Sequence, residues 1–414
     1  MGQVQRIGVT TGGQRPSSSE AIGSTECEAE SLYVHIPFCS HKCHYCDFYS
    51  IVSDSRTYGR FTDALCRELE SQSSRAGRLR TIFVGGGTPT LLPASSWERV
   101  LDTIHACYDL SELEEFTVES NPDTSDESLL RLLRGGGVSR VSIGAQSFES
   151  DLLRFLERSH EPSNVERALE ACERVGIERR NVDLIFAIPG QTITMWRRDL
   201  ERVLGLTPGI DHVSCYALTY EEGTPLTQRV RRGECAIVGE DAEMAMLDAS
   251  IDMLDGAGFE RYEVSNFARR GSECAHNLGY WRCESCLAVG PSASGHLRDG
   301  SSGWRWTNVR SLRDWMASVE ETGFSEAAVL EPPDASRSLR ERLMLGMRVG
   351  EGIAREAVLD EARTIGCERR VLGAIEIATD RGLIENETVR VRPTAEGLRV
   401  ADSLGAMLME AVTG

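Results

Sequence analysis

The sequence predicts an α/β fold: a partial (β/α)6 barrel followed by a loop-rich cap and a small C-terminal winged-helix-like domain. Short β-rich runs alternate with longer stretches of helical periodicity, which indicates parallel strands joined by crossover helices. The length of 414 residues suits one barrel-sized domain and a smaller one. The Pro332-Pro333 pair marks a linker, after which helical patterns dominate.

Six β-rich runs end in Gly, Pro or polar residues, and they cover 32–36, 81–84, 115–118, 140–143, 182–186 and 212–218. The helices predicted between and after them cover 58–74, 96–107, 125–134, 163–175, 194–204 and 240–257. Right-handed crossovers curl such a sheet toward closure, but a complete barrel needs eight units. An open barrel is therefore expected, and a doubly wound sheet is the alternative.

The last third of the chain has a different pattern. A seventh β-rich run at 261–264 leads into 265–310, which has no clear period and is predicted to form the cap. Helical patterns at 337–348, 354–365 and 368–381 then precede a β-like pair around 383–392 and a helix from about Thr394. The predicted division is a disordered tail (1–30), the barrel (31–260), a β extension and cap (261–330), and the C-terminal domain (331–414).

Composition excludes several classes of protein. The chain has 64 acidic against 45 basic residues and a net charge of -19, the wrong sign for a protein that follows a phosphate backbone, so no nucleic-acid partner is expected. It has no run near the roughly 18 apolar residues that a membrane helix needs, so no integral membrane segment is expected. Thirteen cysteines, an odd number, without an apolar signal segment favour the reducing cytoplasm over a secreted disulfide scaffold.

The most specific motif is C-x3-C-x2-C, formed by Cys39, Cys43 and Cys46 directly after the first predicted strand. Three converging thiolates select an iron–sulfur cluster or zinc, and three protein ligands leave one metal position open. From spacing alone, a structural zinc site completed by His41, His44 or a distant group is the alternative.

This motif after the first strand of a partial barrel resembles the cluster motif of the radical S-adenosylmethionine (SAM) superfamily. The flanking residues are similar to those of the branch that contains coproporphyrinogen III dehydrogenase and the HemW heme chaperones, as are the blocks at 85–90, 119–122, 142–148, 183–184, 189–191 and 262–267. The resemblance implies a [4Fe-4S] cluster on the three cysteines, with SAM chelated to the remaining iron. An electron from an external reductant then breaks a C–S bond of SAM and yields a 5′-deoxyadenosyl radical.

The resemblance also implies a SAM site at the ends of the predicted strands, made by Tyr33, Tyr45, Gly86, Gly87, Thr88, Glu119, Gln146, Arg158, Asp183 and Ala217. The glycines can let the backbone approach SAM and offer N–H groups to its carboxylate, although a turn that ends the strand is the alternative. Carboxylates such as Glu119 and Asp183 can accept hydrogen bonds from a ribose or an ammonium, while Gln146 and Arg158 can donate.

Two functions share this scaffold, and two features favour the HemW type. The dehydrogenase is expected to have a fourth cysteine where this chain has Phe48. His276, Asn277, Tyr280 and Trp281 form the H-N-x-x-Y-W motif associated with heme binding, in which an imidazole can ligate iron and aromatic faces can cover a porphyrin. Alternatively, the motif ties down a loop and fills the core of the cap.

The sequence therefore predicts a HemW-like heme chaperone that binds the cluster, SAM and heme and passes heme to an acceptor protein, with no catalytic residue assigned. The alternative is an oxygen-independent coproporphyrinogen III oxidase that makes protoporphyrinogen IX by radical decarboxylation. Two details stay open. Cys274, His276, Cys283 and Cys286 could hold a further metal or be free thiols, and Ser292 and Ser294 stand where Gly or Ala and His are expected.

Overall fold

The computed structural model describes residues 28–52 and 55–413, so the predicted tail lies almost wholly outside the described residues. Its main feature is a 12-stranded sheet that stays open, with β12 at one edge and β7 at the other. Six neighbouring strands run parallel in chain order, β1 (Ala29–Ile36), β2 (Ala76–Gly86), β3 (Glu115–Ser120), β4 (Arg140–Gln146), β5 (Arg179–Phe186) and β6 (His212–Ala217). The predicted partial barrel is confirmed.

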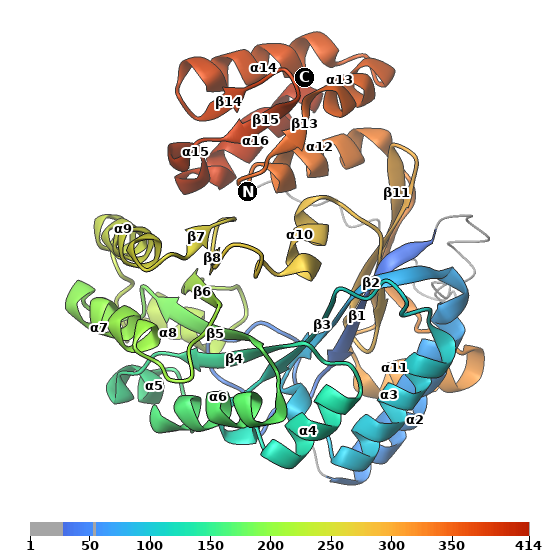
Figure 1. Cartoon of the computed structure of the whole chain (residues 1–414). Helices are drawn as coiled ribbons and strands as arrows, with labels where there is room; N and C mark the ends of the chain where they lie inside the picture. Colours follow the sequence, from blue (N-terminus) through green and yellow to red (C-terminus); the bar gives the residue numbers. More distant parts are fainter. Residues whose placement is uncertain (1–27, 53–54, 414) are drawn as a thin grey trace.

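The crossover helices all lie along the outer, convex face of this sheet (Figure 1), so the doubly wound alternative is wrong. They are α2 (Ser55–Gln72), α3 (Ala94–Cys107), α4 (Glu127–Gly135), α5 (Ser150–Phe155), α6 (Ser163–Val175) and α7 (Ile193–Leu204), followed after β6 by α8 (Pro225–Arg231) and α9 (Glu240–Gly256). Helix α4 shows the local cause: the Asp126 side chain accepts hydrogen bonds from the N–H groups of Ser128 and Leu129, and leucines form its buried face. No helix in the described part of the chain has the length and apolar character that crossing a bilayer requires.

Alternation along the strands gives the sheet two unlike faces. On β1, Leu32, Val34 and Ile36 are fully buried in the core that the sheet shares with the outer helices. The residues between them, Tyr33 and His35, point to the inner side, where His35 shares hydrogen bonds with the Tyr33 hydroxyl and the Tyr49 carbonyl. The inner face is therefore polar, and its groups need partners or a ligand.

The stretch predicted as a loop-rich cap, 265–310, also contains strands that extend the large sheet. Strand β9 (Cys286–Val289) runs parallel beside β1, and β10 (Ser294–Asp299), β11 (Ser302–Asn308) and β12 (Ala327–Glu331) extend the sheet in antiparallel order. At the other edge β8 (Asn266–Ala268) and β7 (Glu260–Arg261) continue from β6, and the remaining helices of this region are α10 (Ala275–Trp281) and α11 (Leu312–Thr322).

Glycine explains why β10 and β11 give little strand signal. Gly295 pairs directly with Trp306, whose ring lies where a side chain at 295 would be. Trp306 is among the largest fully buried side chains. The glycine that weakens the strand pattern is thus required by packing between distant positions.

A single carboxylate fastens this extension to the barrel. Buried Glu68 of α2 accepts hydrogen bonds from the backbone N–H groups of Gly290 (2.7 Å) and Ser325 (3.1 Å). It also accepts from the Trp315 indole (3.0 Å) and the Asn308 amide (3.3 Å). All four donors belong to the segment 290–325, so one side chain joins the two parts.

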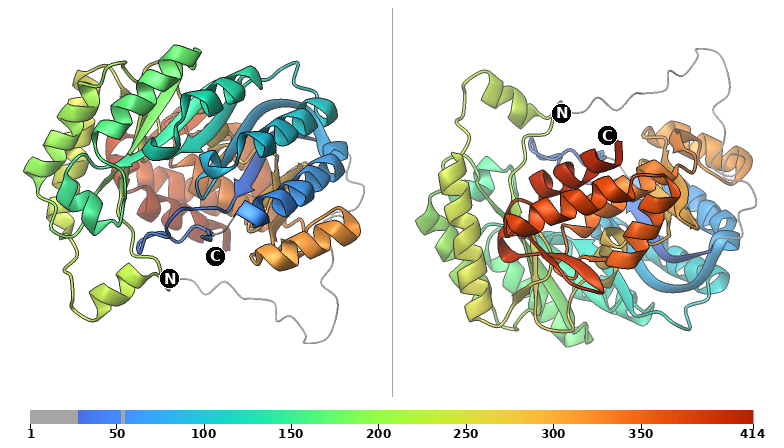
Figure 2. Two further views of the ribbon diagram at one scale, coloured as in Figure 1. Left: turned by 90° about the horizontal axis from the view of Figure 1, so that it is seen from below. Right: turned by 90° about the horizontal axis from the view of Figure 1, so that it is seen from above.

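The C-terminal segment has its own hydrophobic core. Its elements are α12 (Ala335–Gly346), β13 (Ile353–Ala354), α13 (Arg355–Thr364), α14 (Glu368–Asp380), β14 (Ile384–Asn386), β15 (Arg390–Pro393), α15 (Ala395–Arg399) and α16 (Ala401–Thr413), with a small antiparallel sheet in the order β13-β15-β14. The segment lies across the inner side of the large sheet, with α10 between them (Figures 1 and 2). Its likeness to winged-helix domains stays a prediction.

Glu68→Gln should lower the free energy of unfolding by about 2–4 kcal/mol, because the new NH2 group faces buried donors and leaves at least one of them unpaired. Urea unfolding followed by circular dichroism measures this difference. Glu70→Gln on the exposed side of the same helix is the matched control and should change stability by less than about 0.5 kcal/mol. Equal stability of the two variants would contradict the role given to Glu68.

Candidate functional site

The carboxyl ends of the parallel strands bring most of the predicted site residues to one edge of the sheet. This edge is where the ligands of (β/α) barrels gather. Thr88 follows β2, Glu119 lies near the end of β3, Gln146 ends β4, and Ala217 ends β6. In β5, Asp183 pairs with Gly144 of β4 and Ser214 of β6.

The loop after β1 carries the three cysteines of the motif. Cys39 is fixed at its start, where its N–H donates to the Ile51 carbonyl (3.0 Å). All three thiols are free and partly exposed. Burial, with smaller contributions from the neighbouring Cys39 and Cys43, raises the pKa of Cys46 to about 11.

The two histidines of the zinc alternative have other contacts. His41, a candidate fourth ligand, shares a hydrogen bond with the Glu157 carboxylate (3.0 Å), and the His44 ring packs against Phe155. Among residues 28–52 and 55–413, no three His, Cys, Asp or Glu side chains form a site for a single metal ion. A cluster on Cys39, Cys43 and Cys46 stays the prediction from the motif.

Glu157 is a residue that the sequence analysis missed. Its carboxylate accepts from the His44 N–H (3.0 Å) as well as from His41, and its carbonyl lies 3.9 Å from the Cys43 sulfur. Its backbone adopts a left-handed conformation (φ 56°), which is uncommon for a residue with a side chain. Its position next to Arg158 was the available signal.

The glycine run works differently from the prediction. The N–H of Gly86 donates to the Glu119 carboxylate (3.0 Å), that of Gly87 to the Ile36 carbonyl (2.8 Å), and that of Thr88 to the Phe38 carbonyl (2.7 Å). These N–H groups are engaged within the protein, so the predicted donation to a ligand carboxylate is wrong for this conformation. The glycines permit close packing instead, since a Cβ on Gly87 would lie 2.5 Å from the Phe38 oxygen.

Polar side chains are held in place around this edge. Arg158 donates to the Gly144 carbonyl (2.8 Å) and to the side chain of Asn121, a second residue that the sequence analysis missed. The Asn121 amide in turn donates to the Thr88 hydroxyl (3.4 Å), and Asn121 lies within the block 119–122. Arg158 also lies beside Cys43, where its positive charge favours an anionic ligand set.

Two carboxylates lie close together on the inner face. Asp183 accepts from Ser142 (2.9 Å) and Asn181 (2.7 Å). Burial, and then the charge of Asp183, raises the pKa of Glu119 to about 7, although the hydrogen bond from Gly86 opposes this rise. Glu119 therefore changes its charge near neutral pH at the edge where the cysteine loop lies.

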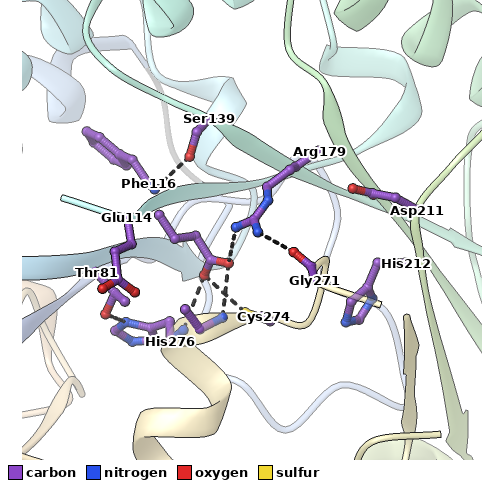
Figure 3. Close-up of polar contacts among 12 residues, drawn as sticks. Thr81, Glu114, Phe116, Ser139, Arg179, Asp211, His212, Gly271, Cys274 and His276 are labelled. Atoms are coloured by element: carbon purple, nitrogen blue, oxygen red, sulfur yellow. Dashed lines mark hydrogen bonds and ion pairs between the residues drawn. The ribbon is translucent and has the colours of Figure 1, made fainter. Parts of the chain in front are cut away.

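The H-N-x-x-Y-W motif lies on α10, near the opposite ends of the strands, as Figure 3 shows for His276. His276 is only 2% exposed, and its ring stacks on Phe83. The Thr81 hydroxyl donates its hydrogen to Ser31, so it accepts a hydrogen bond from Nδ1–H of His276 (2.8 Å). The other ring nitrogen, Nε2, then carries no hydrogen and accepts from the Tyr280 hydroxyl (3.1 Å). With both nitrogens engaged, His276 is a structural residue in this conformation, and the role of an axial iron ligand is not supported.

Glu115 of β3 anchors this helix. It accepts from the N–H groups of Ala275 (3.0 Å) and His276 (3.2 Å) and forms an ion pair with Arg179 (3.6 Å). Burial raises the pKa of Glu115, but Arg140 and these hydrogen bonds outweigh it and hold the pKa below its usual value. The motif therefore lies against the polar inner face at the amino-terminal ends of the strands, where Figure 3 shows His276 beside Thr81.

The thiols of the motif region do not converge. Cys274 Sγ lies 3.2 Å from a Glu115 oxygen, and Cys286 Sγ donates to the Leu287 carbonyl at 3.3 Å. Cys283 adopts a left-handed conformation (φ 58°) that a glycine would accept without strain. The free-thiol alternative fits this geometry, and the further metal does not.

A cavity of about 500 Å³ lies between β1, the residues after the cysteine loop, and the sheet extension. Its lining contains aromatic, imidazole and guanidinium groups: Tyr33, His35, Phe48, Tyr49, Tyr280, His296, Arg305 and Arg310. Asp47 and Ser292 also line it, as does Leu345 of α12. Of the four residues of the motif, only Tyr280 reaches this cavity. Its volume is within the range of small-molecule and cofactor sites.

Comparison with known proteins gives consistent matches. Residues 33–203 match the model of the radical SAM superfamily. The heme chaperone HemW of Lactococcus lactis is 33% identical over 90% of this chain and 96% of its own length, and HemW of Bacillus subtilis is 31% identical over 92% and 100%. The structure of Escherichia coli coproporphyrinogen III oxidase, HemN, superimposes with a TM-score of 0.80 over 94% of this chain and 92% of that chain, at 20% identity.

Glu119 generates a prediction about SAM. The affinity for SAM should rise by up to about tenfold between pH 6 and pH 8. The reason is that an ionised Glu119 accepts hydrogen bonds from SAM more strongly than a neutral one. Isothermal titration calorimetry on the wild type and on Glu119→Gln measures the effect, and the variant should lose most of the pH dependence. Titration of the amino group of SAM is common to both proteins and cancels. Equal pH profiles would remove Glu119 from the site.

Proposed function

Because the chain belongs to the radical SAM superfamily and, within it, to the family of HemW-type proteins, we propose that it is a heme chaperone that receives heme and transfers it to an acceptor protein. The observation that carries this proposal is the match to HemW proteins over nearly the whole chain, including the cavity-forming segments after the barrel. The similarity to HemN at 20% identity concerns the fold alone.

Membership in the superfamily implies a [4Fe-4S] cluster and SAM. Cys39, Cys43 and Cys46 would hold the cluster, since they are the free thiols at the ligand edge of the barrel. When bound, the cluster and SAM supply a 5′-deoxyadenosyl radical after one-electron reduction. An external reductant is a partner in that chemistry.

The residues of this chain bind and orient these groups. Arg158 places positive charge beside Cys43, and Glu157 holds the cysteine loop through His41 and the His44 N–H. Glu119 and Asp183 present acceptors to the hydroxyl and amino groups of SAM. Tyr33, Tyr45, Gln146 and Ala217 complete the proposed SAM site, in which the glycines allow close approach.

The segment after the third cysteine favours heme transport over the coproporphyrinogen III oxidase reaction. Phe48 occupies the position of the fourth cysteine expected in the dehydrogenase, and its side chain is 69% exposed where it lines the cavity. Together with Tyr49 and Tyr280, the Phe48 ring gives the cavity aromatic faces that an apolar ligand can contact. The free thiols suit the reducing cytoplasm, where we expect the protein to act.

Both activities can be measured on one sample that has been reconstituted anaerobically with iron and sulfide. Titration with hemin should produce a saturable change in the Soret band, and incubation with an apo-hemoprotein should then move the heme to that acceptor. Supplying coproporphyrinogen III, SAM and a reductant should yield no protoporphyrinogen IX. Turnover without heme binding would decide for the oxidase.

The cluster ligands yield a separate prediction. Wild-type protein should hold about one [4Fe-4S] cluster per chain, whereas Cys43→Ser should lose it because a serine hydroxyl is a poor ligand for iron in this setting. Iron and sulfide analysis with electron paramagnetic resonance of the reduced sample measures both. Cys107→Ser, at the end of α3, is the control and should keep the cluster. A cluster that persists in Cys43→Ser would contradict the assignment.

A further inference from the structure

We propose that heme binds in the 500 Å³ cavity beside the cysteine loop and that His296 of β10, not His276, supplies its axial ligand. The inference rests on the proposed function and assigns that function to particular residues. The imidazole of the H-N-x-x-Y-W motif, His276, does not line the cavity, and both of its nitrogens make hydrogen bonds, one of them to Tyr280.

His296 has the features of a metal-binding imidazole. Its Nδ1–H donates to the Glu284 carbonyl (3.3 Å), which fixes the ring and leaves a lone pair on Nε2. Nε2 makes no hydrogen bond with any residue that the structure describes. Burial, followed by the charge of Arg305, lowers the pKa of His296 to about 4, so the ring is neutral and able to ligate iron at neutral pH.

The neighbouring strand leaves room for this ring. A Cβ on Gly303 of β11 would lie 2.9 Å from His296 Nε2, so any other residue at position 303 would press on the nitrogen. Gly303 pairs with Arg298, two residues beyond His296 on β10. Glycine at position 303 thus lets the His296 ring lie against β11.

His35, Tyr280 and Cys283 of the cavity have their donor atoms occupied or protonated. His35 donates from Nε2 to the Tyr49 carbonyl (2.9 Å) and accepts at Nδ1 from the Tyr33 hydroxyl (3.0 Å), so neither nitrogen is free. The Tyr280 hydroxyl donates to His276. Burial raises the pKa of Cys283, which keeps its thiol protonated. His296 is thus the lining residue with a free neutral donor.

The remaining walls match the other parts of a heme. Phe48, Tyr49 and Tyr280 provide aromatic faces for the macrocycle. Arg310 donates to the Asp47 carbonyl (3.2 Å) and lies over the Tyr49 ring, and it forms no ion pair with the described residues. A guanidinium without a carboxylate partner at the cavity fits a propionate group. Arg305, by contrast, is paired with Glu341 of α12 (2.8 Å).

Hemin binding to the full-length, anaerobically reconstituted protein tests this inference. His296→Ala should weaken hemin binding at least about tenfold and remove the imidazole signature of the ferric heme in low-temperature electron paramagnetic resonance. Added free imidazole should restore the spectrum. His276→Gln and Cys283→Ser should keep the wild-type heme spectrum, even if His276→Gln lowers stability. Cluster content and circular dichroism show that each variant is folded.

Arg310→Gln should weaken hemin binding several-fold without changing the axial-ligand spectrum. Arg313→Gln is its control, because Arg313 pairs with Asp314 on an 89% exposed side chain and does not line the cavity. A wild-type heme spectrum in His296→Ala, or its loss in His276→Gln or Cys283→Ser with the fold retained, would overturn the inference and leave the chaperone proposal standing. Absence of saturable hemin binding to the wild type would overturn both.

Discussion

The polar inner face of the open sheet is the constraint on which the rest of the structure depends. Alternation along each parallel strand commits one side to the apolar core beneath the helices and the other side to charged and hydrogen-bonding groups. Six strands do not close, so this second side cannot be sealed by the barrel itself. Buried polar groups must still be paired, so other segments of the chain or bound ligands have to supply the partners.

The two ends of this inner face meet that requirement in different ways. At the amino-terminal ends of the strands the protein supplies the partners itself. Glu115 accepts hydrogen bonds from the first N–H groups of α10, and Thr81 accepts one from the His276 ring. At the carboxyl ends of the strands Glu119 accepts from Gly86 and Arg158 donates to Gly144, beside three free thiols. The H-N-x-x-Y-W motif and the cysteine motif are therefore two ends of one polar surface, the first closed by protein and the second suited to ligands.

The periodicity of apolar residues predicted the parallel strands and their crossover helices. The run at 212–218 becomes β6 (His212–Ala217), and the helix expected at 163–175 coincides with α6, because crossover units carry strong periodicity. Strand β10 gave a weak pattern because Gly295 is small to admit the distant Trp306. The roles of Cys39, Cys43 and Cys46 in holding a cluster and of Glu119 in binding SAM stay predictions, the first from the motif and the second from the resemblance. The supporting roles of Glu157 and Asn121, and the burial of His276, depend on contacts between residues far apart in sequence.

The proposed ligand arrangement also bears on how a carrier can release its cargo. The cavity is lined by β1, the residues after the cysteine loop, Tyr280 of α10, the sheet extension, and Leu345 of α12 in the C-terminal segment. Helix α12 is held to the extension through Glu341 and Arg305, and Glu351 pairs with Arg282 just after α10. These are charged contacts between partly exposed side chains, which contribute little stability compared with an apolar interface. In the proposed arrangement His296 and the aromatic walls would hold the heme, and a ligand from the acceptor would replace His296 during transfer.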